Sequence, residues 1–258
     1  MKVLILAAGY ATRLYPLTEK LPKCLLKVGP DTLLDRLIRK LEAVPELTDI
    51  LIVTNARFYR QLSDWRKDLK SRLSVKVIQD GTRSNEERLG AIGDFDLAIR
   101  EENIRTDVLM LASDYLFDQD LNEFTAFCHQ RSDSVTVAVY DLGDPKLAAG
   151  KFGVLELDAD SKVTGMEEKP KEPKTALIGV GVYFFPKCSL PLVREYLRRP
   201  EAQDAPGHFV RWLHEKGQSI FGFHFKGMWY DIGDLNALKE ANLIFNKAVR
   251  PGSPQKGV

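Results

Sequence analysis

The segment Leu4-Ile5-Leu6-Ala7-Ala8-Gly9-Tyr10-Ala11-Thr12-Arg13-Leu14-Tyr15-Pro16-Leu17 begins as an apolar strand and continues into a turn of small residues. Such a turn lets backbone N–H groups approach an anion closely, because no large side chain stands in the way. Arg13 follows the turn, and Pro22-Lys23 comes shortly after it. Two cations beside the turn can neutralise a polyphosphate. The segment therefore predicts a site for a nucleoside triphosphate at the end of the first strand.

Two common phosphate-binding motifs are excluded. The dinucleotide fingerprint requires three spaced glycines after the strand, and only Gly9 is present. The P-loop ends in Gly-Lys-Ser or Gly-Lys-Thr, which is absent here. An ordinary loop between a strand and a helix that contains Arg and Lys by chance is the simplest alternative. It is the weaker interpretation, because several positions must coincide with the strand and the turn.

The segment resembles the signature of the sugar-1-phosphate nucleotidyltransferase family, which includes glucose-1-phosphate thymidylyltransferase. That pattern is a glycine-containing loop, then Thr-Arg-Leu-x-Pro, then Pro-Lys before an apolar segment. The family often has a second glycine where this chain has Ala11. The matching positions are Gly9, Thr12, Arg13, Leu14, Pro16, Pro22 and Lys23.

The resemblance also implies roles for these residues. Backbone groups around Ala8 and Gly9, with Thr12, are expected to hold the triphosphate. Arg13 is expected to neutralise the departing pyrophosphate. Lys23 is expected to bridge the α-phosphate and the incoming phosphate, so that Arg13 and Lys23 are the candidate catalytic residues.

The N-terminal half alternates apolar strand-like runs with amphipathic helical spacing. Strands are predicted at Lys2–Leu6, 50–54, 75–78 and Val108–Ala112, and helices at 32–43, 59–73 and 89–100. Asp31 is the predicted N-cap of the first helix. This alternation predicts an α/β fold with a mostly parallel, Rossmann-like central sheet and helices on both faces. Ligands are then expected at the carboxyl ends of the strands.

From about residue 134 the pattern changes to strand-like runs linked by turns. Strands are expected at 135–140, 152–157, Val163–Glu168 and Leu177–Phe185, and short helices at 192–197 and 208–215. Asp234 is expected to cap a last helix. These strands predict an antiparallel or mixed extension of the sheet that carries the acceptor pocket, as in the nucleotide-diphospho-sugar transferase fold that the resemblance implies.

No clear linker or internal repeat divides the chain. We therefore expect a single domain over residues 1–249, with a nucleotide-binding half at 1–133 and a sugar-phosphate-binding half at 134–249. The tail 250–258 is rich in Pro, Gly and Lys and is expected to be frayed. A chain ending near residue 258 leaves no room for a C-terminal left-handed β-helix acyltransferase domain, so a monofunctional protein is expected.

The bulk composition is that of a globular protein. Hydrophobic residues make up 44% and charged residues 28% of the 258 residues. Because 37 Lys and Arg balance 36 Asp and Glu, no overall field favours nucleic acid or a membrane surface. There is no apolar run of about 18 residues and no signal peptide. Cys24, Cys128 and Cys188 are scattered and odd in number, which favours reduced thiols in the cytoplasm.

Two acidic segments are candidates for a metal site. Asp114 directly follows the strand Val108–Ala112 and Ser113, and Asp231 lies in Gly227-Met228-Trp229-Tyr230-Asp231-Ile232-Gly233. In the family that the chain resembles, an Asp after this strand and the Asp of a Trp-x-Asp-x-Gly segment are the metal ligands. Mg²⁺ suits two carboxylates completed by water and substrate phosphates. A turn or helix-capping aspartate is the alternative for Asp114, and packing in the core is the alternative for Trp229.

A third group of residues points to the acceptor. Glu168-Lys169-Pro170 resembles a family segment whose Glu binds sugar hydroxyls and whose Lys contacts the sugar phosphate. Gly153 and Gly181 resemble acceptor-side glycines of the family. The alternatives are a charged surface turn at 168–174 and ordinary turn or bulge glycines.

The residues that recognise the base are the least determined. The segment 79–91 occupies the place of the base-recognition loop of the family, and the candidates are Gln79, Arg88, Leu89 and Gly90. Thymidylyltransferases have a Gln-x-x-x-x-Gly-Leu-Ala type of segment here, whereas Arg88-Leu89 partly matches cytidylyltransferases. The identity of the base stays open.

The resemblance implies that an NTP and a sugar 1-phosphate react to an NDP-sugar and pyrophosphate, with Mg²⁺ as cofactor. The expected substrates are dTTP or UTP and glucose 1-phosphate or a related sugar, and a homo-oligomer is possible. A cytidylyltransferase of the same family and a non-catalytic nucleotide-sugar-binding regulator are the alternatives. A glycosyltransferase is a further one, but its usual Asp-x-Asp motif is not present at Ser113-Asp114-Tyr115-Leu116.

Overall fold

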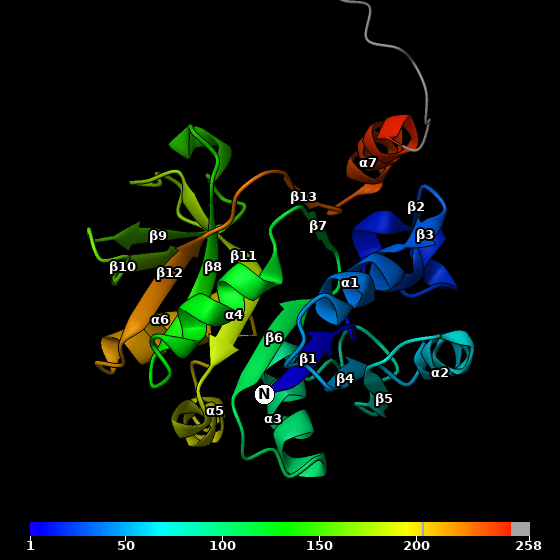
Figure 1. Cartoon of the computed structure of the whole chain (residues 1–258), viewed down its shortest axis with the longest axis horizontal. Coiled ribbons are helices and arrows are strands. Elements are labelled where there is room, and N and C mark those ends of the chain that lie inside the picture. The colour runs from blue at the N-terminus through cyan, green and yellow to red at the C-terminus, as the bar shows by residue number, and fades with distance from the viewer. Residues whose placement is uncertain (203, 249–258) are drawn as a thin grey trace, which may run out of the picture.

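The computed structural model describes residues 1–202 and 204–248. A nine-stranded sheet runs through it. Four neighbouring strands are parallel, in the order β6 (Val108–Ala112), β1 (Lys2–Leu6), β4 (Asp49–Thr54) and β5 (Ser74–Gln79). Figure 1 shows these strands on one side of the molecule and the other strands of the sheet on the opposite side.

The second part of the sheet is mixed. It starts at β11 (Leu177–Phe185), which pairs antiparallel with β6, β8 and β9. The other strands are β8 (Val135–Asp141), β9 (Gly153–Leu157), β10 (Val163–Glu168) and β12 (Ile220–His224). The antiparallel pairing of β11 with β6 joins the two halves of the chain in one sheet, which confirms the predicted mostly parallel α/β fold with an antiparallel extension.

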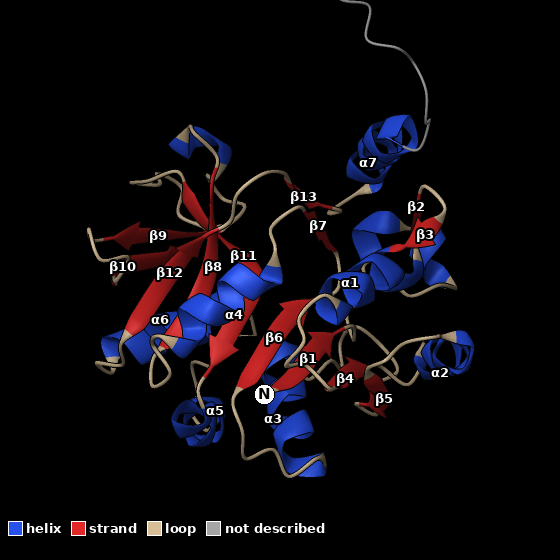
Figure 2. Ribbon diagram, viewed as in Figure 1, coloured by secondary structure: helices blue, strands red, loops and turns tan. Residues whose placement is uncertain are grey.

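Helices cover both faces because the side chains of each central strand alternate between two cores. Val3 and Ile5 of β1 pack in one core with α1 (Leu33–Glu42), α2 (Tyr59–Asp68) and α4 (Leu121–His129). Leu4 packs on the other face of the sheet, whose strands are drawn in red in Figure 2. The helices on that face are α3 (Gly90–Glu101), α5 (Leu190–Leu197) and α6 (Pro206–Glu215).

Two small two-stranded sheets stand outside the main sheet. They are β2 (Lys27–Val28) with β3 (Asp31–Thr32), and β7 (Tyr115–Phe117) with β13 (Trp229–Asp231). The last helix, α7 (Leu235–Ala248), packs on both through Leu238 and Ala241. Five short 3₁₀ turns complete the described elements: η1 (Thr12–Leu14), η2 (Leu17–Glu19), η3 (Lys23–Leu25), η4 (Pro145–Leu147) and η5 (Lys187–Ser189).

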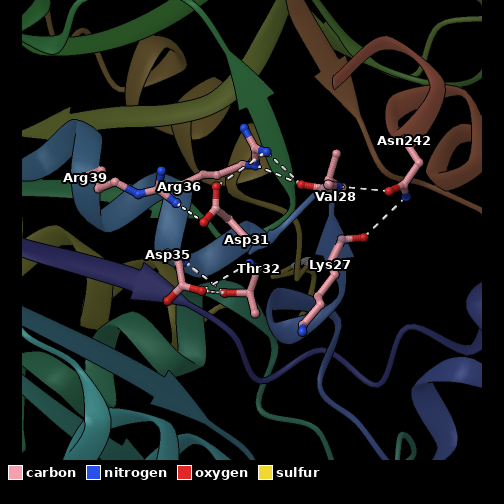
Figure 3. A network of polar contacts seen from close by, with 9 residues as sticks. Lys27, Val28, Asp31, Thr32, Asp35, Arg36, Arg39 and Asn242 are labelled. Carbon is pink, nitrogen blue, oxygen red and sulfur yellow. Dashed lines mark hydrogen bonds and ion pairs between the residues drawn. The ribbon is translucent and has the colours of Figure 1, made fainter. Parts of the chain in front are cut away.

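Polar contacts hold α7 and the β2–β3 hairpin against α1 (Figure 3). Asn242 accepts a hydrogen bond from the backbone N of Gly29 at 2.9 Å and donates to the carbonyl of Lys27 at 3.3 Å. Arg36 of α1 donates to the carbonyl of Val28 at 2.7 Å. This network fixes the hairpin that follows the Lys23 turn in the sequence.

Several predicted details differ from the structure. Thr32, and not Asp31, caps α1, because its hydroxyl accepts from the N of Asp35 in a capping box. Asp31 instead forms ion pairs with Arg36 and Arg39 of the same helix. The helix predicted over 59–73 ends at Asp68, and β7, α4, β12 and β13 were not expected. The cap by Asp234 is confirmed, since its carboxylate accepts from the backbone N of residues 236 and 237.

The single domain over 1–249 stays a prediction, supported by a sheet that draws strands from both halves. The tail 250–258 lies outside the described residues.

Candidate active site

A cavity of about 720 Å³ lies between the two halves of the chain. Eight residues proposed from the sequence line it, and they come from both halves. They are Arg13, Lys23, Asp114, Gly153, Glu168, Lys169, Gly181 and Asp231. The structure thus places the two candidate catalytic cations, the two candidate metal ligands and the four candidate acceptor residues around one space.

The antiparallel pairing of β7 with β13 brings the two aspartates together. Asp114 lies between β6 and β7, and Asp231 is the last residue of β13. In the antiparallel pairing Asp231 stands opposite Tyr115, the residue next to Asp114. The backbone N of Ile232 also donates to the carbonyl of Asp114 at 3.2 Å. Residues remote in sequence therefore become neighbours through backbone hydrogen bonds.

The four charged residues on the nucleotide side act on one another. The Lys23 Nζ lies 2.5 Å from Oδ2 of Asp114 in a half-buried ion pair. Burial and the carboxylate of Asp114 raise the pKa of Asp231 to about 6, while the charges of Lys23 and Arg13 oppose that increase. An anionic pair of carboxylates is thus compensated by two cations, an arrangement that can accept both a metal ion and phosphate groups.

The N-terminal loop carries Arg13 on η1 and Lys23 on η3. Asn55, which follows β4, donates to the carbonyl of Ala8 at 2.8 Å and ties this loop to the sheet. Ala11 has a left-handed backbone with φ 47°, a conformation that favours glycine. That geometry explains why a second glycine is common at this position of the motif.

The remaining candidates for nucleotide binding do not line this cavity. Ala8, Gly9 and Thr12 are on the loop between β1 and Arg13, and Gly9 is exposed. Gln79, at the end of β5, lines a separate hollow of about 390 Å³. Arg88, Leu89 and Gly90, at the start of α3, line another hollow of about 220 Å³.

The acceptor side is built around Glu168 at the end of β10. Its side chain is 10% exposed, and Lys169 Nζ lies 4.0 Å from its Oε1. A Cβ at Gly153 would come within 2.7 Å of Glu168 Oε2, so this glycine leaves room for the carboxylate. Gly181 has a different reason to be glycine, since its φ is 71° and a Cβ there would meet the ring of Tyr115 at 2.2 Å.

An aromatic cluster in the cavity wall was missed by the sequence analysis. The ring of Trp229 lies 5.3 Å from Tyr115, 5.8 Å from Tyr140 and 5.6 Å from Phe152, centroid to centroid. All four residues line the cavity. Only the aromatic character of the segment around Trp229 signalled them, because Tyr140 and Phe152 come from β8 and the start of β9.

Comparison with known proteins identifies the family of the chain. The profile of the Nucleotidyl transferase family matches residues 2–247. The chain belongs to this family. The match confirms the resemblance drawn from the N-terminal motif.

Individual relatives are more distant. Bifunctional protein GlmU of Methanococcus aeolicus is 28% identical over 257 residues, which cover 97% of this chain and 56% of that protein. Glucose-1-phosphate adenylyltransferase of Fusobacterium nucleatum is 27% identical over 256 residues, which cover 93% of this chain and 65% of the relative. The chain therefore spans little more than half the length of GlmU.

Solved structures agree with the fold. A structure assigned as a glucose-1-phosphate thymidylyltransferase from Bacillus anthracis superposes with a TM-score of 0.80 at 23% identity, covering 98% of both chains. A UDP-glucose pyrophosphorylase complexed with UDP-glucose has a TM-score of 0.80 at 20% identity, covering 96% of this chain and 98% of the other. None of the helices described for this chain has the length and apolar character needed to cross a membrane.

The residues of the cavity fit Mg²⁺ rather than a metal that needs a full protein cage. Within residues 1–202 and 204–248, no group of three or more His, Cys, Asp or Glu side chains is arranged to hold a metal ion. Asp114 and Asp231 carry hard carboxylate oxygens and line a roomy cavity. Mg²⁺ typically takes one or two carboxylates, with water and substrate phosphates as its other ligands.

The three cysteines of the chain are free thiols. Cys24 follows Lys23, but burial raises its pKa to about 12. The thiolate, which is the reactive form, is therefore suppressed. Cys24 packs as a small apolar residue in the core.

Asp94 of α3 makes stability depend on pH. It is 4% exposed, its Oδ1 has no hydrogen-bond partner, and burial with the charges of Asp80 and Asp204 raises its pKa to about 8. The folded state then binds more protons than the unfolded state between about pH 4 and pH 8. The free energy of unfolding should fall as pH rises through this window, by at most about 1.4 kcal/mol per pH unit from this group.

Denaturant unfolding of wild type and Asp94→Asn at pH 5, 7 and 9 measures this contribution. Asp94→Asn should lose the part of the pH dependence that comes from Asp94. Asp160→Asn, at an exposed turn, is the control and should keep the wild-type slope. Equal slopes for all three proteins would show that Asp94 is not the titrating group.

Proposed function

We propose that the chain transfers a nucleotidyl group from an NTP to a sugar 1-phosphate, forming an NDP-sugar and pyrophosphate. The observation that carries this proposal is the cavity lined jointly by Arg13, Lys23, Asp114, Asp231 and Lys169. Each charge suits one part of the reaction, and family membership supports the reaction class.

The chemistry needs no general base. A phosphate monoester is largely dianionic near neutral pH, since its second pKa is about 6, so its oxygen can attack the α-phosphorus directly. In the described part of the chain, none of the four histidines, His129, His208, His214 and His224, lines the cavity. The barrier lies in bringing two anions together and in the charge that develops on pyrophosphate. Positioning and electrostatic stabilisation therefore supply the catalysis.

Each residue then has one task. Backbone groups around Ala8 and Gly9 hold the triphosphate, and Arg13 stabilises the departing pyrophosphate. Lys23 contacts the α-phosphate and the attacking phosphate. Glu168 and Lys169 orient the acceptor, and Asp114 with Asp231 would hold Mg²⁺, which supplies positive charge to phosphate oxygens when bound.

The identities of the nucleotide and of the sugar are also part of the proposal. We take dTTP or UTP and glucose 1-phosphate, or a related sugar, as the first candidates. The names of the relatives and structural neighbours include an adenylyltransferase, a thymidylyltransferase and a UDP-glucose pyrophosphorylase. Arg88 favours a cytidylyltransferase as the second candidate, because it matches part of the pattern at this place in those enzymes. The separate hollow at the start of α3 is lined by Glu86, Arg88 and Asp204, and such charged groups can discriminate bases by their hydrogen-bonding edges.

A pyrophosphate-release screen tests the function. It combines dTTP, UTP, CTP, GTP and ATP with a panel of sugar 1-phosphates and Mg²⁺. We expect release with at least one pair, dependent on both substrates. Nucleotide-sugar binding without release from any pair would favour a non-catalytic regulator.

The free thiols suggest the cytoplasm as the place of action.

A further inference from the structure

The short segment 204–207, which leads into α6, contacts both the start of α3 and the acceptor-side residue Glu168. Its first residue, Asp204, lies on the start of α3 beside Arg88 and Gly90. Its last residue, Gly207, packs against the carboxylate of Glu168. Ala205, Pro206 and Gly207 line the 720 Å³ cavity, whereas Asp204 lines the separate hollow at α3.

Asp204 is anchored by two hydrogen bonds. Its Oδ1 accepts from the backbone N of Ala91 at 2.6 Å, and its Oδ2 accepts from Nε of Arg88 at 3.2 Å. A Cβ on Gly90 would lie 2.3 Å from Oδ1, so the carboxylate rests directly on the backbone of the helix start. A carboxylate that accepts a free N–H group of the first turn is favourable both as a cap and through the helix dipole.

Gly207 makes the contact at the other end. A Cβ at this position would lie 2.1 Å from Oε2 and 3.2 Å from Cδ of Glu168. Gly153 approaches the same oxygen from β9, where a Cβ would lie 2.7 Å away. The carboxylate of Glu168 thus sits between two glycines, and a methyl group at either one forces it to move. Because the clashing atoms are the end of a flexible side chain, such a change moves the carboxylate without breaking the fold.

We propose that Asp204 and Gly207 are positioning residues for the acceptor, which act through Glu168. Asp204 fixes the start of α6 to the start of α3. Gly207, which has no Cβ, leaves the space that the carboxylate of Glu168 occupies. The proposal rests on the proposed function, in which Glu168 orients the sugar phosphate. It assigns to Asp204 an effect on the acceptor, although Asp204 does not line the acceptor cavity.

The test compares KM for the acceptor in single variants with KM in a Glu168→Gln background. Asp204→Ala and Gly207→Ala should each lower kcat/KM for the sugar phosphate about 10- to 100-fold, as expected for a misplaced orienting group. In the Glu168→Gln background the same changes should add little, because residues that act through one group are not additive. Asp204→Asn keeps an oxygen for the N–H of Ala91 and should retain most of the activity.

One control variant, one further variant and one stability measurement separate an effect on positioning from an effect on stability. Glu201→Gln changes an exposed carboxylate that pairs with Arg199, and should behave as wild type. Gly153→Ala moves the Glu168 carboxylate from the other side and should raise KM for the acceptor. Gly207→Ala should not lower the melting temperature, because alanine favours a helix more than glycine does.

The outcomes are distinct. Full additivity of Asp204→Ala with Glu168→Gln would overturn the proposal, and so would an unchanged acceptor KM in an active Asp204→Ala enzyme. Absence of pyrophosphate release by the wild-type protein contradicts the proposed function instead. In that case hydrogen exchange still tests the tether, since Asp204→Ala should speed exchange at the starts of α3 and α6. Unchanged exchange at both places would also overturn it.

Discussion

Replacing Arg13 by alanine should lower kcat/KM for the NTP by about 10² to 10³, the usual effect of removing one charge-stabilising donor. Arg13 lies on η1, is exposed, and lines the cavity next to the paired aspartates. Its loss removes a positive charge from the place where pyrophosphate departs. Because no core packing is lost, the melting temperature should stay within about 1 °C of wild type, as for most surface substitutions.

Arg13→Lys is the matched variant for this measurement. It keeps the charge but loses the planar fork that binds phosphate in two places, so it should recover part of the rate. Arg60→Ala, at an exposed position of α2 that does not line the cavity, controls for a general change of surface charge. Near-wild-type turnover by Arg13→Ala would remove this residue from the mechanism.

Replacing Asp231 by asparagine should have an effect of similar or larger size, with turnover falling at least about 10²-fold at saturating Mg²⁺. The Asp231 carboxylate lies close enough to Asp114 for that charge to raise its pKa, because β13 pairs with β7 next to Asp114. A neutral amide is a poorer ligand for a hard cation than a carboxylate. It also removes repulsion between two acids, so the protein should be at least as stable as wild type.

The Mg²⁺ dependence of the rate distinguishes a ligand from a structural residue. Asp231→Asn should need a higher Mg²⁺ concentration for half-maximal turnover, and removal of divalent cations by a chelator should stop the wild-type enzyme. Asp160→Asn lies at an exposed turn outside the cavity and is the control. An unaltered Mg²⁺ requirement in Asp231→Asn, with normal turnover, would contradict the assignment.

The sequence predicted the parallel half of the fold well because its signals are local. Apolar runs such as Val108–Ala112 alternate with helical spacing, and short connections leave few topologies. The β7–β13 pair was missed because each strand has only three residues and pairs with a partner far along the chain. The cap of α1 was misplaced by one residue because Asp31 and Thr32 are both good N-caps, and the capping box with Asp35 decides between them.

The site was predictable where a motif carries charge. Arg13, Lys23, Asp114 and Asp231 were all named from short segments, and the structure brings them to one cavity. The proposed positioning roles of Asp204 and Gly207 could not be predicted from the sequence. They depend on contacts with α3 and with Glu168, which lie far away along the chain. The residues proposed for base recognition lie in two separate hollows, which the order of residues along the segment 79–91 does not reveal.

The most direct test follows the phosphates of the NTP through the reaction. With a substrate pair from the screen, label in the α-phosphate should appear in the NDP-sugar, and label in the γ-phosphate should appear in pyrophosphate in equal amount. Both products should require the sugar 1-phosphate and Mg²⁺. Pyrophosphate formed without the sugar phosphate, or α-label recovered as free NMP, would contradict transfer between two substrates held in one cavity.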